Sequence, residues 1–203
     1  MKNKGDNMDK DLETIKEYMI SEPVSTFITK WILESTPYIF KDKEAEYIRW
    51  RELIADKLKI DPCNIYITGS ASLGFSLNPN KSLKPFNNES DVDVSIVSSH
   101  FFDVAWYDLL HENRSNLSWK MKNAIDDHRN RLIYWGTIAT DKILPLLSFG
   151  AEWDKIIQES RIYDFLENRD INFRIYKDTS AIRNYLTSSV NSCKNYLLEE
   201  ITK

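Results

Sequence analysis

The sequence has little cysteine, no long apolar run and no large excess of charge of either sign. Its two cysteines, Cys63 and Cys193, are far apart and form no CxxC pair, which argues against a zinc knuckle or a disulfide framework. No apolar run approaches the roughly 20 residues that span a bilayer, and the start MKNKGDNMDKDLE is too polar for a signal peptide. These absences predict a cytoplasmic protein with no membrane partner.

The charge balance excludes a general attraction for polyanions. Lys and Arg total 27 against 31 Asp and Glu, which gives a net charge of -4. A phosphate-rich partner must therefore be bound by a local group of residues. The length of 203 residues, with 42% hydrophobic residues, is enough for one domain with a real core.

Apolar spacing predicts that the first sixty residues are mostly helical. The pattern indicates a helix from Leu12, a second over SEPVSTFITKWILES with Ser21 as N-cap, and a third from Lys41 to Lys59. We expect residues 1–60 to be a helical segment that packs on the core. Residues 61–203 then form the main domain, and the two parts make one structural unit.

After Pro62 the pattern changes from helical to alternating. Period-two alternation predicts strands in NIYITG, DVDVSIV and INFRIY, with helices near 101–110, 117–134 and 153–166 between the second and the third. A closing helix is predicted after Asp178 as N-cap, with one apolar face made of Ile182, Leu186, Val190, Cys193 and Leu197. The sum is an α+β chain in which helices flank a small mixed sheet.

The strand DVDVSIV carries two carboxylates on one face. Side chains alternate along a strand, so Asp91 and Asp93 point the same way, about 7 Å apart. Like charges at this spacing raise each other's pKa unless a cation lies between them. Oxygen ligands favour Mg²⁺ or Mn²⁺ over zinc. On spacing alone, two exposed aspartates on an amphipathic strand remain the alternative.

The strand NIYITG ends at Gly69 and Ser70. Glycine allows close backbone approach, and the serine hydroxyl and free N–H groups suit a phosphate. An ordinary turn is the alternative for this dipeptide taken alone. A metal-bound nucleoside triphosphate requires both features, since phosphates contact donors while carboxylates hold the metal ion.

Together these residues carry a family resemblance. ITGSASLGFS followed by SDVDVSIV resembles the signature of the DNA polymerase β-like nucleotidyltransferase superfamily. The resemblance implies the nucleotidyltransferase fold and a metal-dependent transfer of a nucleoside monophosphate from an NTP to a hydroxyl of RNA, protein or a small molecule, with release of pyrophosphate. It also implies that Gly69 and Ser70 bind the phosphates and that Asp91 and Asp93 bind Mg²⁺ or Mn²⁺.

The family pattern also has a third acid on a later strand. Asp170, at the start of INFRIY, is the candidate for a third catalytic and metal-binding carboxylate, although a cap or an ion pair with Arg169 suits it equally. Arg174 shares the face of Asp170, and its fork suits a phosphate. The sequence departs from the family pattern at two places. Leu73-Gly74 stands where an Arg-Gly pair is usual, and the linker from Ala71 to Ser90 is longer than is typical of the family.

The longer linker holds two lysines. Lys81 and Lys84 are candidates to reach a triphosphate from this loop, and a solvated turn is the alternative.

Elsewhere, the spacing of Trp106, Trp119, Trp135 and Trp153 predicts core or interhelix positions rather than base stacking. The segment WKMKNAIDDHRNR reads as a mixed-charge solvated helix face, with an RNA or triphosphate contact as the alternative.

Three functions therefore compete. The first is an active nucleotidyltransferase, whose partners are an NTP, its acceptor and a protein partner. The second is a catalytically silent module that binds nucleotides or regulates a partner in a defence or toxin–antitoxin assembly. The third, a nucleic-acid-binding adaptor, is disfavoured by the acidic charge balance.

Overall fold

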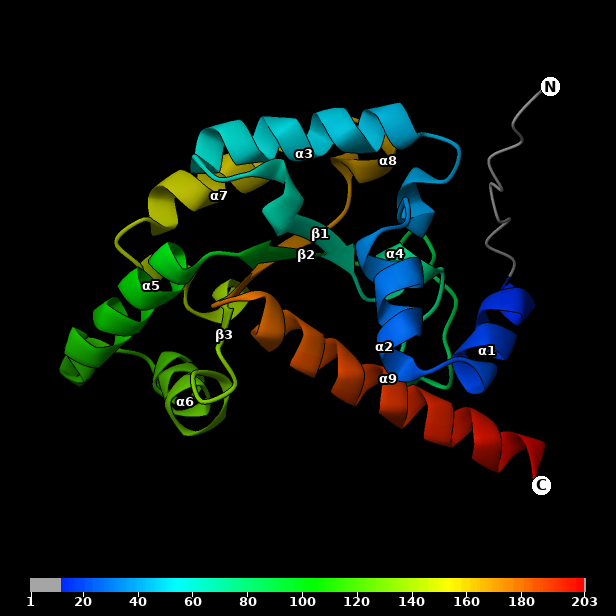
Figure 1. The fold of residues 1–203 in the computed structure, drawn as a ribbon. Helices are drawn as coiled ribbons and strands as arrows, with labels where there is room; N and C mark the ends of the chain where they lie inside the picture. The colour runs from blue at the N-terminus through cyan, green and yellow to red at the C-terminus, as the bar shows by residue number, and fades with distance from the viewer. Residues whose placement is uncertain (1–11, 203) are drawn as a thin grey trace.

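The computed structural model of the protein describes residues 12–202. Its centre is a mixed four-stranded sheet with helices on both faces, which confirms the predicted α+β class (Figure 1). The strand order is β1-β2-β4-β3; β2 is antiparallel to β1 and parallel to β4, and β3 is antiparallel to β4. The strands are β1 (Ile65–Thr68), β2 (Val92–Val97), β3 (Thr137–Ala139) and β4 (Ile171–Tyr176).

The helices surround this sheet. A π-helical turn follows α2 at Ile28–Leu33, and another follows α6 at His128–Leu132. The helices are α1 (Leu12–Ser21), α2 (Val24–Phe27), α3 (Glu44–Leu58), α4 (Ser70–Leu73), α5 (Ser99–His111), α6 (Trp119–Asp127), α7 (Gly150–Glu159), α8 (Asp164–Glu167) and α9 (Thr179–Ile201).

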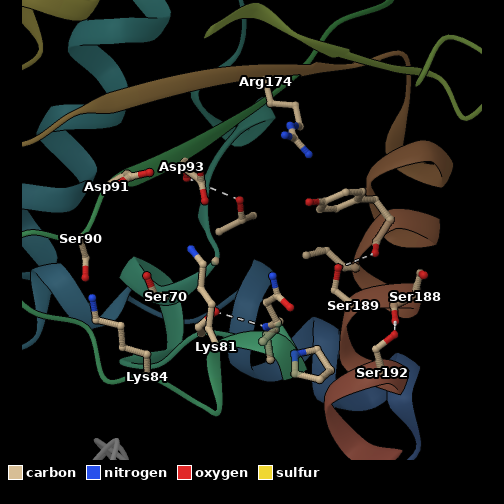
Figure 2. A pocket seen from close by; sticks show the side chains of 18 of the residues that line it. Ser70, Lys81, Lys84, Ser90, Asp91, Asp93, Arg174, Ser188, Ser189 and Ser192 are labelled. Atoms are coloured by element: carbon tan, nitrogen blue, oxygen red, sulfur yellow. Dashed lines mark hydrogen bonds between the residues drawn. The ribbon is translucent and has the colours of Figure 1, made fainter. Parts of the chain in front are cut away.

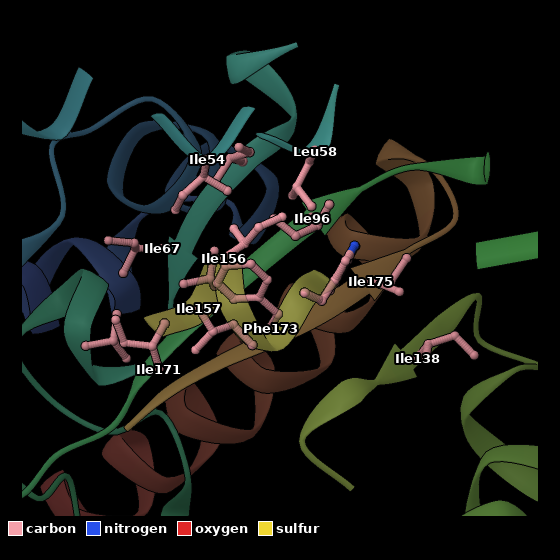
Figure 3. Close-up of a cluster of buried hydrophobic side chains, with 14 of the residues drawn as sticks. Ile54, Leu58, Ile67, Ile96, Ile138, Ile156, Ile157, Ile171, Phe173 and Ile175 are labelled. Atoms are coloured by element: carbon pink, nitrogen blue, oxygen red, sulfur yellow. The ribbon is translucent and has the colours of Figure 1, made fainter. Parts of the chain in front are cut away.

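Alternation along the strands divides the sheet into an apolar and a polar face. Val92, Val94 and Ile96 of β2 and the isoleucines of β4 are buried in one core with residues of α3 and α7. Figure 3 shows Ile54 and Ile156 beside Ile96 and Phe173. Burying one such side chain contributes about 1.5–3 kcal/mol. Residues of α3 share this core with the strands, whereas residues of α1 and α2 belong to a second buried cluster that also contains Val97 and Tyr176.

The opposite face carries Asp93 and Arg174 and is partly covered by α9. Helix α9 begins where predicted, because the Asp178 carboxylate accepts the Ala181 N–H at 2.8 Å. Its predicted apolar face is buried together with α1 and α2, which confirms that prediction. Helix α9 therefore forms a wall beside the polar face of β2 and β4.

Two local predictions are wrong, and one strand was not predicted. Ser21 is not an N-cap but the last residue of α1, and its hydroxyl donates to the Glu17 carbonyl; the chain breaks at the extended Pro23. The predicted helix at 153–166 ends at Glu159, where Ser160 accepts the Trp50 indole N–H at 2.9 Å. Strand β3 was not predicted, because three residues are too few for an alternating pattern.

Among residues 12–202, no helix combines the length and the apolar character needed to cross a membrane.

Candidate functional site

A cavity of about 630 Å³ opens on the polar face of the sheet. Its walls are the ends of β1 and β2, the loop between them, Arg174 of β4 and the serine-bearing face of α9 (Figure 2). The cavity brings together all but one of the residues predicted for the site: Gly69, Ser70, Lys81, Lys84, Asp91, Asp93 and Arg174.

Gly69 forms the turn between β1 and α4. Its backbone has φ 65° and ψ -149°, a combination that is essentially restricted to glycine. A Cβ atom at this position would lie 2.8 Å from Oδ2 of Asp93. The glycine is therefore required both by the turn and by the carboxylate that lies against it.

Asp91 and Asp93 enter the cavity from the start of β2. Asp93 pairs with Thr68 across the ladder to β1, and both aspartates are exposed to the cavity. The cavity walls partly desolvate Asp93, and this raises its pKa; the negative charges of Asp91 and Asp141 add to the effect, while Arg174 opposes it. Desolvation at Asp93 therefore outweighs the compensation that nearby cations provide.

The loop between β1 and β2 folds back on itself. The Ser76 N–H donates to the Lys84 carbonyl at 3.0 Å, and the Phe86 N–H donates to the Gly74 carbonyl at 2.8 Å. These bonds place the side chains of Lys81 and Lys84 on the cavity wall. The positive charge of Lys81 reaches Asp93, where it lowers the carboxyl pKa.

Arg169 fixes the end of this loop. Its guanidinium donates to the carbonyls of Asn87 at 2.6 Å and Ser90 at 2.9 Å, and it lies over the Phe86 ring. These contacts hold the residues that lead directly into Asp91. Sequence analysis did not assign this role, since nothing in the spacing relates Arg169 to the loop.

Arg174 points into the cavity between Asp93 and α9 (Figure 2). Burial alone would lower its pKa, but Tyr185, Tyr176 and Asp93 raise the pKa above its ordinary value, so the guanidinium stays charged. Its centre lies 5.1 Å from the centroid of the Tyr185 ring, in a cation–π contact. Arg174 is therefore a fixed cation that faces the carboxylates.

Asp170 does not join the site. Strand β4 begins one residue later, the Asp170 carbonyl accepts the Val92 N–H at 2.8 Å, and its exposed side chain does not line the cavity. Its carboxylate forms no ion pair with any residue in the 12–202 range, so the alternative roles as cap or ion-pair partner are not seen either. The position that pairs with Asp93 on β4 is Asn172.

Other residues at the site were not predicted. Asp141, just after β3, is close enough for its charge to act on Asp93. Helix α9 supplies an aromatic ring and three hydroxyls, and only its docking on the sheet reveals them: Tyr185, Ser188, Ser189 and Ser192. Within the described part of the chain, no three His, Cys, Asp or Glu side chains form a group that could hold a metal ion by themselves.

The chain matches no family model, no curated protein and no solved structure. The chemistry of the site must therefore be inferred from its own residues.

Proposed function

We propose that this chain is a metal-dependent nucleotidyltransferase. It binds a nucleoside triphosphate in the cavity and transfers the nucleoside monophosphate to an acceptor hydroxyl. The observation that carries the proposal is the contact between the Gly69 turn and the Asp93 carboxylate, because it joins a phosphate-binding type of turn and an acidic pair in one cavity.

The donor set fits Mg²⁺ or Mn²⁺. Asp91 and Asp93 provide hard oxygen ligands that line the cavity, and neither carboxylate forms an ion pair with a residue that the structure describes. Mg²⁺ is commonly bound by one or two protein carboxylates together with substrate phosphates, so two aspartates are sufficient. When bound, the ion would neutralise charge on the phosphates and polarise the reacting groups.

The triphosphate has its own ligands on the other walls. The Ser70 hydroxyl, the two loop lysines and the Arg174 fork all reach the cavity. Three cations there offset much of the charge of a triphosphate, and an arginine fork suits phosphate oxygens in particular.

In the proposed reaction, the acceptor hydroxyl oxygen forms a bond to the α-phosphorus. The bond from that phosphorus to the bridging oxygen breaks, pyrophosphate leaves, and the hydroxyl proton passes to solvent. The contribution of the protein is to position the triphosphate and balance its charge.

A specific observation supports a second candidate, a nucleotide-binding module that does not transfer. The position opposite Asp93 on β4 is the amide Asn172, and Asp170 lies outside the cavity. Such a module would hold the metal nucleotide and regulate a protein partner in a defence or toxin–antitoxin assembly.

The test incubates the protein with each α-³²P-labelled NTP, Mg²⁺ or Mn²⁺, and a cell lysate as the source of acceptors. We expect label in RNA, protein or a small product with the wild type and none with Asp93→Asn. Nucleotide binding without transfer under every condition would favour the second candidate. Neither binding nor transfer would refute both.

A further inference from the structure

A second feature of the surface is the outer face of the helix formed by α6 and the π-helical turn after it. Three rings on this helix and the turn that follows are largely exposed: Trp119 at 79%, Tyr134 at 81% and Trp135 at 59%. Of the four tryptophans predicted to take core or interhelix positions, Trp153 is buried, whereas Trp119, Trp135 and Trp106 on α5 are exposed and do not belong to the core. Large exposed rings in one segment indicate a binding surface.

The same segment carries positive charge that the protein does not neutralise. Its two acids are already paired, Asp126 with Arg114 and Asp127 with Arg131, each at 2.9 Å. The remaining cations, Lys120, Lys122 and Arg129, form no ion pair with any residue that the structure describes. We name these three cations and the three rings the aromatic–basic surface.

The aromatic–basic surface is held rigidly to the sheet. His128 is fully buried beneath it and bonds the Ala124 carbonyl through Nδ1 at 2.7 Å. Its Nε2 accepts the Ala139 N–H of β3 at 3.0 Å. Because burial lowers the pKa of His128, the ring stays neutral and keeps this pair of bonds. A fixed surface loses little conformational entropy when it binds a ligand.

One end of the aromatic–basic surface leads toward the cavity. Trp135 is followed by Gly136, whose carbonyl accepts the Lys177 N–H at 2.9 Å. A Cβ atom on Gly136 would lie 3.0 Å from Cβ of Ala181, in the first turn of α9. Tyr185 comes one helical turn later and lines the cavity. The start of α9 thus lies between Gly136, which follows the surface, and Tyr185 in the cavity wall. Figure 1 shows that α9 begins close to β3.

We infer that the aromatic–basic surface binds single-stranded nucleic acid and guides its end to the cavity as the acceptor. Exposed rings stack on unpaired bases, whereas a duplex offers no free base faces along its length. The three cations contact the phosphates between those bases. Lysine is depleted in protein–protein interfaces, so a protein partner fits this surface less well. The assignment of the strand as the acceptor rests on the proposed function, whereas binding of the strand requires no transfer of a nucleotide.

The test measures fluorescence anisotropy of a labelled single strand of about 12 nucleotides with the full chain, in the absence of NTP and metal. RNA and DNA of the same sequence are compared with the matching RNA duplex. We expect the single strands to bind more tightly than the duplex. Trp119→Ala/Tyr134→Ala/Trp135→Ala should weaken binding about tenfold or more.

A matched control removes exposed rings elsewhere. Trp106→Ala/Tyr107→Ala on α5, where the rings are 46% and 61% exposed, should leave the affinity within about twofold. Lys120→Gln/Lys122→Gln/Arg129→Gln should reduce the slope of log K against log salt by about 2, or 0.7 for each single-strand phosphate contact. Lys59→Gln, on an exposed lysine outside the segment, should not change the slope.

The outcomes separate this inference from the proposed function. Surface-dependent binding of a single strand supports the binding site even if no label is transferred, in which case the proposed function and the acceptor role of the strand fail together. Label transferred to a protein or a small molecule, with no binding of single strands, overturns the inference and leaves the proposed function standing. The inference is also overturned if the α5 control variant loses as much affinity as the triple ring variant, or if the duplex binds as tightly as the single strands.

Discussion

Two walls of the same cavity differ in chemistry and in how they are built. The carboxylate wall consists of Gly69, Ser70, Asp91 and Asp93, all at the adjoining ends of two paired strands. The cationic wall consists of Arg174 and Tyr185, which come from β4 and α9. The cavity is thus polarised, with two carboxylates on one side and a guanidinium on the other.

The largest effect is expected from a substitution in the carboxylate wall. Asp93→Asn should reduce transfer by about 10³-fold or more, because it removes a ligand that acts directly on the reacting phosphates. Asp170→Asn is the matched control, and we expect it to change the rate less than about threefold. Rates measured with labelled NTP check both variants. A loss in Asp170→Asn as large as that in Asp93→Asn would show that the cavity, as described, omits an essential group.

The next effect concerns the glycine that joins the turn to Asp93. Gly69→Ala should lower the free energy of unfolding by about 1–3 kcal/mol, because the backbone conformation is strained for alanine. It should also weaken nucleotide binding, since the new Cβ displaces Oδ2 of Asp93. Gly74→Ala, also at positive φ but against Tyr38, should lose stability yet bind nucleotide normally once folded. Urea unfolding and nucleotide titration measure the two properties separately.

A smaller effect tests the cationic wall. Arg174→Gln should weaken NTP binding about 10- to 100-fold, since charge-assisted bonds to phosphate contribute about 1.5–3 kcal/mol. Lys177→Gln, on a cation that lies over the Phe102 ring, is the control and should bind NTP normally. Tight NTP binding by Arg174→Gln would assign the phosphates to the loop lysines instead.

The smallest effect is on stability and pH in metal-free buffer. Because the folded protein raises the pKa of Asp93 above its ordinary value of 3.8, ionised Asp93 costs stability, and the cost grows as the pH rises through the folded-state pKa. Asp93→Asn should therefore raise Tm at pH 7 by about 1–2 °C, a typical size for an exposed position. The difference should vanish near pH 3. A lower Tm for Asp93→Asn at pH 7 would contradict this sign.

The carboxylate wall was predictable because its residues are close in sequence and share one strand pair. Alternation places Asp91 and Asp93 on the same face, and glycine at a strand end indicates a turn. The α9 cap at Asp178 and its buried face followed from equally local rules.

The cationic wall depends on long-range packing. The face of Arg174 was predicted from alternation, but its contact with Tyr185 follows only from the docking of α9 against β4. Similarly, Arg169 acts on carbonyls about 80 positions earlier in the chain, a distance over which no local pattern operates. Asp170 lies directly before β4, as predicted, but alternation did not reveal that its side chain does not line the cavity.

The most direct test of the central claim is a calorimetric titration of NTP into the protein with and without Mg²⁺, for the wild type and Asp93→Asn. If the two walls hold a metal nucleotide between them, the wild type binds NTP much more tightly with Mg²⁺, and Asp93→Asn loses that gain. Equal affinities in all four titrations would contradict the assignment of the cavity as a metal–nucleotide site.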